Sequence, residues 1–259
     1  MESLHSIIVP VRDRNRQLAL CLWSLMHSAQ TTGNAPWELV VVDGGSEVVA
    51  EGWEHVKVIT TTPDNPFNKS RLLNIGIEAA RGDLITFLDA DAIVGPLFMS
   101  AAREAFAGDN TLTKVCYRVW NVSEQSVVQH DDFPHGKIAF EAYGLPHKGN
   151  CPKPKMRPIF GNSQQSIRRD TLGDCRFDEA YVGRGFEDID FNAALWEKHG
   201  SSYNALMITD PSRAMCHIAN GQFDGHWGSR HYNLENRRRY FGKWTKKLWN
   251  KRRSRMLRH

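Results

Sequence analysis

Two acidic side chains one residue apart, Asp89 and Asp91, are the residues of this chain best placed to do chemistry. They follow the apolar run 84–88, which predicts a buried strand that delivers both carboxylates at its carboxyl end. Open α/β sheets bind their ligands at that edge. Paired carboxylates there suit a hard divalent cation, which can grip the phosphates of a nucleotide. A charged turn after a strand would look the same, so the interpretation depends on the other motifs.

A second acidic group, formed by Glu187, Asp188 and Asp190, lies where a helix over 187–198 is predicted to begin. A carboxylate in such a place can accept a proton from a reacting hydroxyl. The same acids also fit the first turn of a helix, where the helix dipole stabilises negative charge. The two interpretations are compatible, because a catalytic acid can stand at a helix N-terminus.

Strands and helices alternate over the first 90 residues, which is the pattern of a Rossmann-like nucleotide-binding half. The strand candidates are short continuous apolar runs, as expected for buried parallel strands. Gly82 fits the cap position just past the second helix. The predicted strands cover 6–11, 39–42, 56–59 and 84–88, and the predicted helices cover 18–29 and 70–80.

The second part of the chain is less regular. The stretch 130–158 is rich in His, Pro, Gly and Lys and predicts a long loop, and such loops are usually functional or mobile. Order is expected to return over 160–167. The other predicted elements are helices over 96–107 and 187–198 and strands over 114–122 and 203–208.

Four motifs, in this order along the chain, resemble those of glycosyltransferases of the GT-A fold, above all the family 2 type. The C-terminal half resembles the β-1,4-galactosyltransferases, and the resemblance spans residues 5–220. It implies an α/β fold with a mixed central sheet. Phe186 departs from the galactosyltransferase pattern, which has a glycine there, so acceptor specificity is not implied. The motifs are Ile8–Arg14, Val41–Ser46, Arg71–Gly76 with Phe87–Asp91, and Gly183–Asp190.

The resemblance implies a donor site for a nucleotide-diphosphate sugar. Asp43 would contact the base of the nucleotide, and the opening strand and loop would hold the nucleoside. Asp89 would contact the ribose or a metal-bound water. Neither the sugar nor the base of the donor is specified. The implied donor-binding residues are Pro10, Arg12, Asp43, Arg71, Asn74 and Asp89.

The resemblance also implies a Mn²⁺ or Mg²⁺ ion, held by Asp91 with Asp89 and completed by His217. A purely structural histidine at position 217 fits the sequence almost as well, and His226 and His231 are weaker candidates for the same place. The metal would neutralise the leaving diphosphate.

On the acceptor side, the resemblance implies that Asp188 is the general base and that Glu187 binds acceptor hydroxyls. A base that acts directly on the hydroxyl implies inversion at the anomeric carbon. The implied enzyme is therefore a metal-dependent hexosyl- or pentosyltransferase.

Composition supports a globular cytoplasmic protein. Apolar residues make up 41% and charged residues 24%, which argues against wholesale disorder, and no apolar run approaches the roughly 20 residues of a membrane span. The N-terminus shows no basic leader. The five cysteines form no Cys-x-x-Cys pair, so they indicate neither a zinc site nor a disulfide framework.

The charge is divided unevenly along the chain. Residues 230–259 carry 12 Lys and Arg against one acid, a net of +11, whereas residues 1–229 carry a net of −7. We therefore expect a catalytic domain over 1–229, with a nucleotide-sugar-binding half (1–95) and an acceptor-side half with a lid (96–229). A basic amphipathic tail over 230–259 would follow.

Tyr240, Trp244 and Leu248 form an aromatic and apolar stripe on the predicted tail helix. Three interpretations stay open. The stripe and the charges suit an anionic membrane surface near a lipid-linked saccharide acceptor. They equally suit DNA in which a modified base is the acceptor. In the third interpretation the stripe packs on the catalytic domain and the charges are solvated. The acceptor is expected to be a saccharide, a lipid-linked saccharide or a modified base in DNA.

Two other function classes account for parts of the sequence. A sugar-nucleotidyltransferase would have a glycine-rich basic loop after the first strand, whereas the loop 12–16 has no glycine. A nucleic-acid-binding module without catalysis would explain the tail. It would not explain two separate groups of acids.

Overall fold

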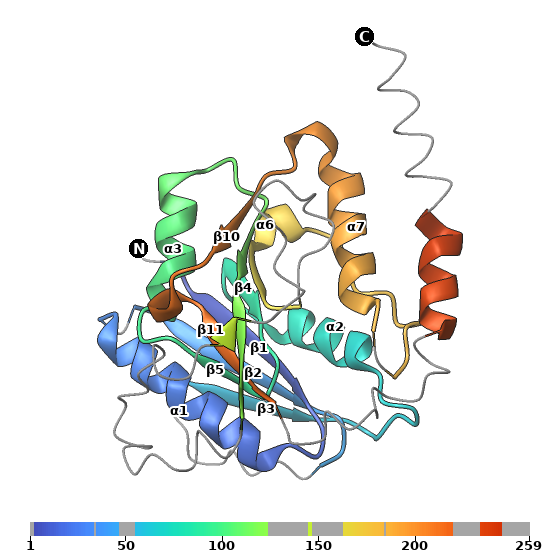
Figure 1. The fold of residues 1–259 in the computed structure, drawn as a ribbon, viewed down its shortest axis with the longest axis horizontal. Helices are drawn as coiled ribbons and strands as arrows, with labels where there is room; N and C mark the ends of the chain where they lie inside the picture. Colours follow the sequence, from blue (N-terminus) through green and yellow to red (C-terminus); the bar gives the residue numbers. More distant parts are fainter. Residues whose placement is uncertain are drawn as a thin grey trace.

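A seven-stranded mixed sheet forms the centre of the molecule (Figure 1). The computed structural model describes residues 3–33, 35–46, 55–123, 145–146, 163–183, 185–219 and 234–244. The strand order is β10-β6-β9-β4-β1-β2-β3, and only β9 runs antiparallel to its neighbours β4 and β6. The predicted α/β fold with a mixed central sheet is therefore confirmed. The strands are β1 (His5–Val11), β2 (Trp37–Asp43), β3 (Val56–Thr60), β4 (Leu84–Phe87), β6 (Lys114–Tyr117), β9 (Gln165–Arg168) and β10 (Ala205–Ile208).

Helices cover both faces of this sheet. Successive side chains of a strand point to opposite faces. Ile7 and Val9 accordingly pack with α1 and α3, whereas Ile8 packs with α2 and α7. Both faces are buried, so the strands read as continuous apolar runs. The helices are α1 (Asn15–Thr31), α2 (Lys69–Ala79), α3 (Phe98–Gly108), the short α6 (Arg169–Leu172) and α7 (Glu187–His199).

A smaller second sheet has the order β5-β11-β7-β8. The single strand predicted over 114–122 is wrong, because it divides at Arg118 into β6 of the large sheet and β7 of the small one. The Arg118 amide donates to Ile208 O, and its carbonyl accepts from Met215 N, so the chain changes sheets there. The strands are β5 (Ala92–Val94), β7 (Val119–Ser123), β8 (Leu145–Pro146) and β11 (Met215–Ala219).

The cap predicted at Gly82 is also wrong. Helix α2 ends with Ala80 as its C-cap, in an extended conformation. Gly82 is needed for a different reason: a Cβ atom there would lie 2.5 Å from Leu4 O and 2.7 Å from Ser6 N. The glycine lets the chain that enters β4 approach the start of β1.

A helix over residues 234–244 lies beside α7 (red in Figure 1). Tyr240 and Trp244 are 5% and 1% exposed and pack with Tyr181 and Ala193. For these two members of the stripe, packing on the catalytic domain is the interpretation that the structure confirms. Leu248, the rest of the tail, His226, His231 and most of the loop 130–158 lie outside the described residues.

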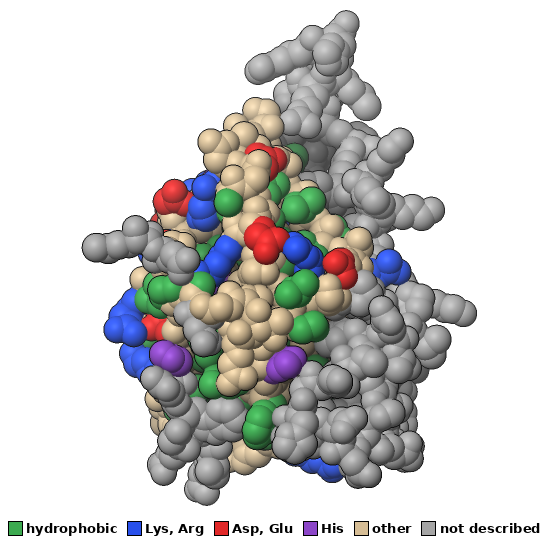
Figure 2. All heavy atoms as spheres, turned by 90° about the vertical axis from the view of Figure 1, so that its left-hand side faces the viewer, with side chains coloured by type: hydrophobic (Ala, Val, Ile, Leu, Met, Phe, Trp, Pro, Cys, Tyr) green, Lys and Arg blue, Asp and Glu red, His purple; other side chains and the backbone are tan. Residues whose placement is uncertain are grey.

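Figure 2 shows the side of the molecule that carries α1 and α3. Acidic and basic side chains are interspersed there among exposed apolar ones, as on an ordinary solvent-exposed face. Of the helices in the described part of the chain, none is both long and apolar enough to cross a bilayer.

Candidate active site

The motif residues converge on one edge of the large sheet. Strands β1, β2 and β4 run parallel, so their carboxyl ends meet there. β9 runs the other way, with Gln165 opposite Phe87, so its first residue reaches the same edge. Helices α2 and α7 begin near this edge. The site is therefore built from segments that are far apart in the sequence.

The loops after β1 and β2 are locked together. Asp43 is fully buried, and its Oδ1 accepts hydrogen bonds from Ser46 N (2.9 Å) and Ser46 Oγ (2.7 Å). The same hydroxyl accepts from Asp13 N at 2.8 Å. Gly45 has φ +97°, and a Cβ atom there would lie 2.3 Å from Pro63 Cγ, so this turn requires glycine. The predicted contact of Asp43 with a nucleotide base stays a prediction.

The two predicted donor-binding arginines both contact Asp64. Arg12 Nη1 donates to Asp64 O at 2.6 Å, and its guanidinium lies over the Phe67 ring at 4.8 Å. Arg71 Nη1 donates to Asp64 Oδ2 at 2.8 Å. Pro10 lies near the end of β1, opposite Val42. Asp64 therefore connects Arg12, in the loop after β1, with Arg71 of α2.

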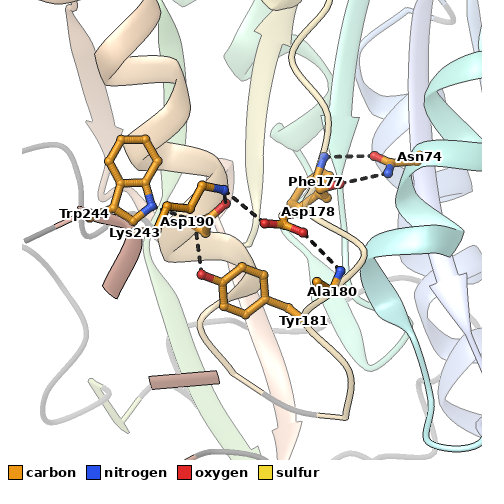
Figure 3. A network of polar contacts seen from close by, with 8 residues as sticks. All are labelled: Asn74, Phe177, Asp178, Ala180, Tyr181, Asp190, Lys243 and Trp244. Atoms are coloured by element: carbon orange, nitrogen blue, oxygen red, sulfur yellow. Dashed lines mark hydrogen bonds and ion pairs between the residues drawn. The ribbon is translucent and has the colours of Figure 1, made fainter. Parts of the chain in front are cut away.

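Asn74 holds α2 against the segment that leads to α7. Its Nδ2 donates to Phe177 O (2.9 Å), and its Oδ1 accepts from Phe177 N (2.9 Å; Figure 3). Its Nδ2 also donates to Glu179 Oε1 at 2.8 Å. Both amide hydrogens are used in these contacts. The structure thus shows a positioning role for Asn74, and its contact with a donor stays a prediction.

The Asp89 carboxylate is surrounded by donors. Lys69 Nζ donates to Oδ1, and Ser163 Oγ (3.0 Å) and Gln164 Nε2 (2.5 Å) donate to Oδ2. Sequence reasoning missed Lys69, Ser163 and Gln164. The available signals were weak: Lys69 is two residues before the Arg71 motif, and Gln164 is in the stretch where order was expected to return.

Asp91 lies past the end of β4 with its side chain 17% exposed, and Arg14 Nη1 is 3.9 Å from its carboxylate. Burial, together with the charges of Asp91 and Asp89, raises the pKa of the nearby Cys21 thiol, which therefore stays neutral. His217 in β11 pairs with Ala92, the residue after Asp91. His217 thus lies on the strand that pairs with β5, and β5 begins directly after Asp91. The side chain of His217 lies outside the described part of the structure.

A complete set of metal ligands is not present among the residues described, where no three His, Cys, Asp or Glu side chains are grouped to hold an ion. The metal therefore stays a prediction. The residue types fit it, since a carboxylate and an imidazole are both ligands that Mn²⁺ accepts.

Asp188 and Glu187 form the first turn of α7. The Asp188 Oδ1 accepts from Ile189 N at 2.8 Å. Burial and the adjacent Glu187 raise the pKa of Asp188 to about 7, while the charge of Lys69 opposes the rise. Burial works to lower the pKa of Lys69, but the charges of Asp89, Glu187 and Asp188 raise it, so the amine stays protonated. Lys69 therefore links the acids of both predicted motifs.

The turn before α7 has an unusual backbone. Gly183, Gly185 and Phe186 have φ values of +71°, +96° and +74°. A phenylalanine in this left-handed region is strained, and this is the position where the galactosyltransferase pattern has a glycine. The Phe186 ring packs against Tyr240, with 5.7 Å between ring centroids. The residue that departs from the galactosyltransferase pattern, Phe186, thus contacts helix 234–244.

Comparisons with known proteins bear on the family and the fold of the chain. The family model described as glycosyl transferase family 2 matches residues 6–172. A search of curated protein sequences returns no match. Crystal structures of S. aureus TarS 1–349, alone and in complex with UDP, match 83% of this chain at 18% identity, with TM-scores of 0.56 and 0.58. A third structure, of S. aureus TarS, also has a TM-score of 0.58 at the same coverage of this chain and the same identity.

The chain spans 60% of the length of the TarS 1–349 structures and 36% of the third. At this identity the likeness shows the fold alone.

Proposed function

Because this chain belongs to glycosyl transferase family 2, we propose that it moves a sugar from a uridine-diphosphate sugar to an acceptor hydroxyl, with inversion at the anomeric carbon. The choice of uridine is supported by the UDP complex of TarS, whose fold this chain shares.

The single observation that carries the proposal is the position of Lys69. Its ammonium donates to Asp89, at the end of β4, and its pKa is raised by Glu187 and Asp188, at the start of α7. The donor-side and acceptor-side motifs therefore meet at one cation. Inverting glycosyl transfer needs the two motifs close together, because the leaving diphosphate and the attacking hydroxyl must be on opposite sides of one sugar carbon.

On the donor side, Asp91 and His217 would hold a divalent cation, Mn²⁺ or Mg²⁺. When bound, the cation supplies positive charge to the leaving diphosphate. Asp89, fixed by Lys69, Ser163 and Gln164, would accept a hydrogen bond from the ribose or from a metal-bound water. Arg12 and Arg71 would line the nucleotide, and Asp43 would contact its base.

On the acceptor side, Asp188 would take the proton of the hydroxyl as its oxygen attacks the anomeric carbon. A carboxylate with a pKa near the working pH is suited to this step. Glu187 would bind neighbouring hydroxyls of the acceptor. Attack from the side opposite the diphosphate gives a single displacement and an inverted product.

The acceptor is proposed to be a saccharide, a lipid-linked saccharide or a modified base in DNA. The outward side of helix 234–244 supports an anionic partner, because Arg237 and Arg238 are exposed there with Phe241. Salt titrations of binding to duplex DNA and to anionic vesicles distinguish DNA from a membrane as the anionic partner. Binding to DNA should fall linearly in log–log terms with salt, and binding to vesicles should also need Phe241.

A thermal-shift screen of UDP-, GDP-, CDP- and dTDP-sugars, each with and without Mn²⁺, tests the donor. A UDP-sugar at about 100 times its Kd adds roughly 2.7 kcal/mol of stability, which raises Tm by roughly 5–10 °C for a chain of this size. Equal shifts with all four nucleotides, or no shift with any, would contradict the proposal. Product stereochemistry by NMR is an independent check, and a retained configuration would exclude the single displacement.

A further inference from the structure

Asp190, in the first turn of α7, is bound from helix 234–244 (Figure 3). It is 2% exposed. Its Oδ1 accepts from Trp244 Nε1 (2.6 Å) and from Tyr181 OH (3.1 Å), and its Oδ2 accepts from Lys243 Nζ (2.9 Å). Asp190 lies two residues after Asp188, so these bonds act on the same helical turn as the proposed base.

A second set of bonds holds the turn before α7. Asn236 is 2% exposed, and its Nδ2 donates to Val182 O and to Gly185 O, both at 3.0 Å. The Val182 carbonyl directly precedes the residues with positive φ, and the Gly185 carbonyl belongs to one of them. Lys243 also pairs with Asp178 Oδ2 at 3.0 Å, just upstream. One helix therefore binds the chain before, within and after the turn that positions Asp188.

The contacts depend on one another. A buried carboxylate is stable only while it is paired and hydrogen-bonded, and Asp190 has two of its three partners on helix 234–244. Undocking this helix would leave Asp190 without Trp244 and Lys243. It would also leave the Val182 and Gly185 carbonyls without Asn236. The start of α7 is therefore expected to keep its geometry only while the helix is docked.

We propose that helix 234–244 is a positioning element of the active site, which holds the turn 182–186 and the first turn of α7 so that Asp188 faces Lys69. The proposal rests on the proposed role of Asp188. It makes the start of the basic tail part of the catalytic domain rather than an appendage. Asn236, Lys243 and Trp244 are the positioning residues.

The test uses the full chain and two substitutions on the buried side of the helix. Asn236→Asp keeps the size of the side chain and removes both amide donors. Lys243→Met keeps the aliphatic stem and removes the ion pairs, while Lys243→Arg keeps a cation as the rescue variant. Gly242→Ala is the matched control, since a Cβ atom at Gly242 meets nothing within 4 Å.

Three measurements are made on each variant: UDP affinity with Mn²⁺ by calorimetry, kcat and KM for UDP-sugar hydrolysis, and amide hydrogen exchange of the segment 178–190. In Asn236→Asp and Lys243→Met we expect kcat to fall at least tenfold, with UDP affinity and KM within twofold of the parent. Exchange over 178–190 should be faster, and exchange in β1 and β2 should be unchanged. Lys243→Arg and Gly242→Ala should behave like the parent.

Parent-like kcat and exchange in both loss variants would overturn the proposal. Equal losses of UDP affinity and kcat, with faster exchange throughout the chain, would also overturn it by indicating a general stability role. The failure of the proposed function looks different. A parent protein that hydrolyses no UDP-sugar would remove the catalytic role of Asp188, while the exchange experiment would still report whether the helix holds the segment 178–190.

Discussion

Replacing Asp188 with asparagine is the most direct test of the proposed chemistry. The substitution keeps the shape of the side chain and removes the group that would accept the proton. Loss of a general base lowers the rate about 10²–10⁴-fold, which corresponds to roughly 2.7–5.4 kcal/mol of transition-state stabilisation. UDP affinity should change little, because the hydrogen bond of Asp188 is to Ile189 N within α7.

The pH dependence of kcat/KM is a second quantitative test of Asp188. Burial and Glu187 raise the pKa of Asp188 to about 7, against the opposing charge of Lys69. The base works when it is deprotonated, so the rate should fall as pH falls through this value. About one tenth of the carboxylates are ionised at pH 6 and about nine tenths at pH 8. We therefore expect kcat/KM to rise about tenfold between pH 6 and pH 8, and the Asp188→Asn variant to lack this rise.

The assay is UDP release from a UDP-sugar at saturating Mn²⁺, with kcat and KM measured at half-unit steps of pH. Glu78→Gln, an exposed acid on α2 away from the site, is the control for a simple loss of charge. A variant that kept the parental acid limb, or that lost UDP affinity while kcat stayed at the parental value, would refute the assignment of Asp188 as the base.

Three further substitutions test the rest of the site. Lys69→Met removes the cation that lowers the pKa of Asp188, so the acid limb should move to higher pH; an unmoved limb would show that Lys69 does not act on Asp188. Asp91→Asn should abolish activation in a Mn²⁺ titration, as EDTA should in the parent, and full metal-free turnover would count against a metal mechanism. Gly45→Ala should lower the free energy of unfolding in urea by roughly 1–3 kcal/mol, because it places a Cβ atom 2.3 Å from Pro63 Cγ at positive φ; unchanged stability would mean that the turn relaxes.

Much of the fold could be predicted because its signals are local. Buried parallel strands read as continuous apolar runs, and the strands expected over 6–11, 39–42, 56–59 and 84–88 overlap β1 to β4. The strand β5 was missed because three residues are too few to show a period. The division of 114–122 at Arg118 depends on bonds to Ile208 and Met215, which no local pattern reveals.

The site was predictable only in part for a related reason. Asp89, Asp91 and Asp188 could be named as candidates because each lies at or next to the end of a regular element and in a recognisable motif. Lys69 could not, because its role arises from Asp89 and Asp188, which come close only in the folded chain. Asn74 belongs to a recognised motif, yet its observed partners are Phe177 and Glu179. A motif thus identifies a residue more reliably than it identifies its contact.

The tail shows why charge and periodicity left several partners open. A stripe of Tyr240 and Trp244 suits any apolar surface, and a sequence does not distinguish a bilayer from another part of the same protein. The decisive feature is polar: Asp190 and Asn236 are buried and satisfied only when helix 234–244 and α7 are together. Such pairs specify one partner because a mismatch leaves a buried group unpaired. The exposed Arg237 and Arg238 of the same helix impose no comparable requirement, so they suit an anionic surface in general rather than one particular partner.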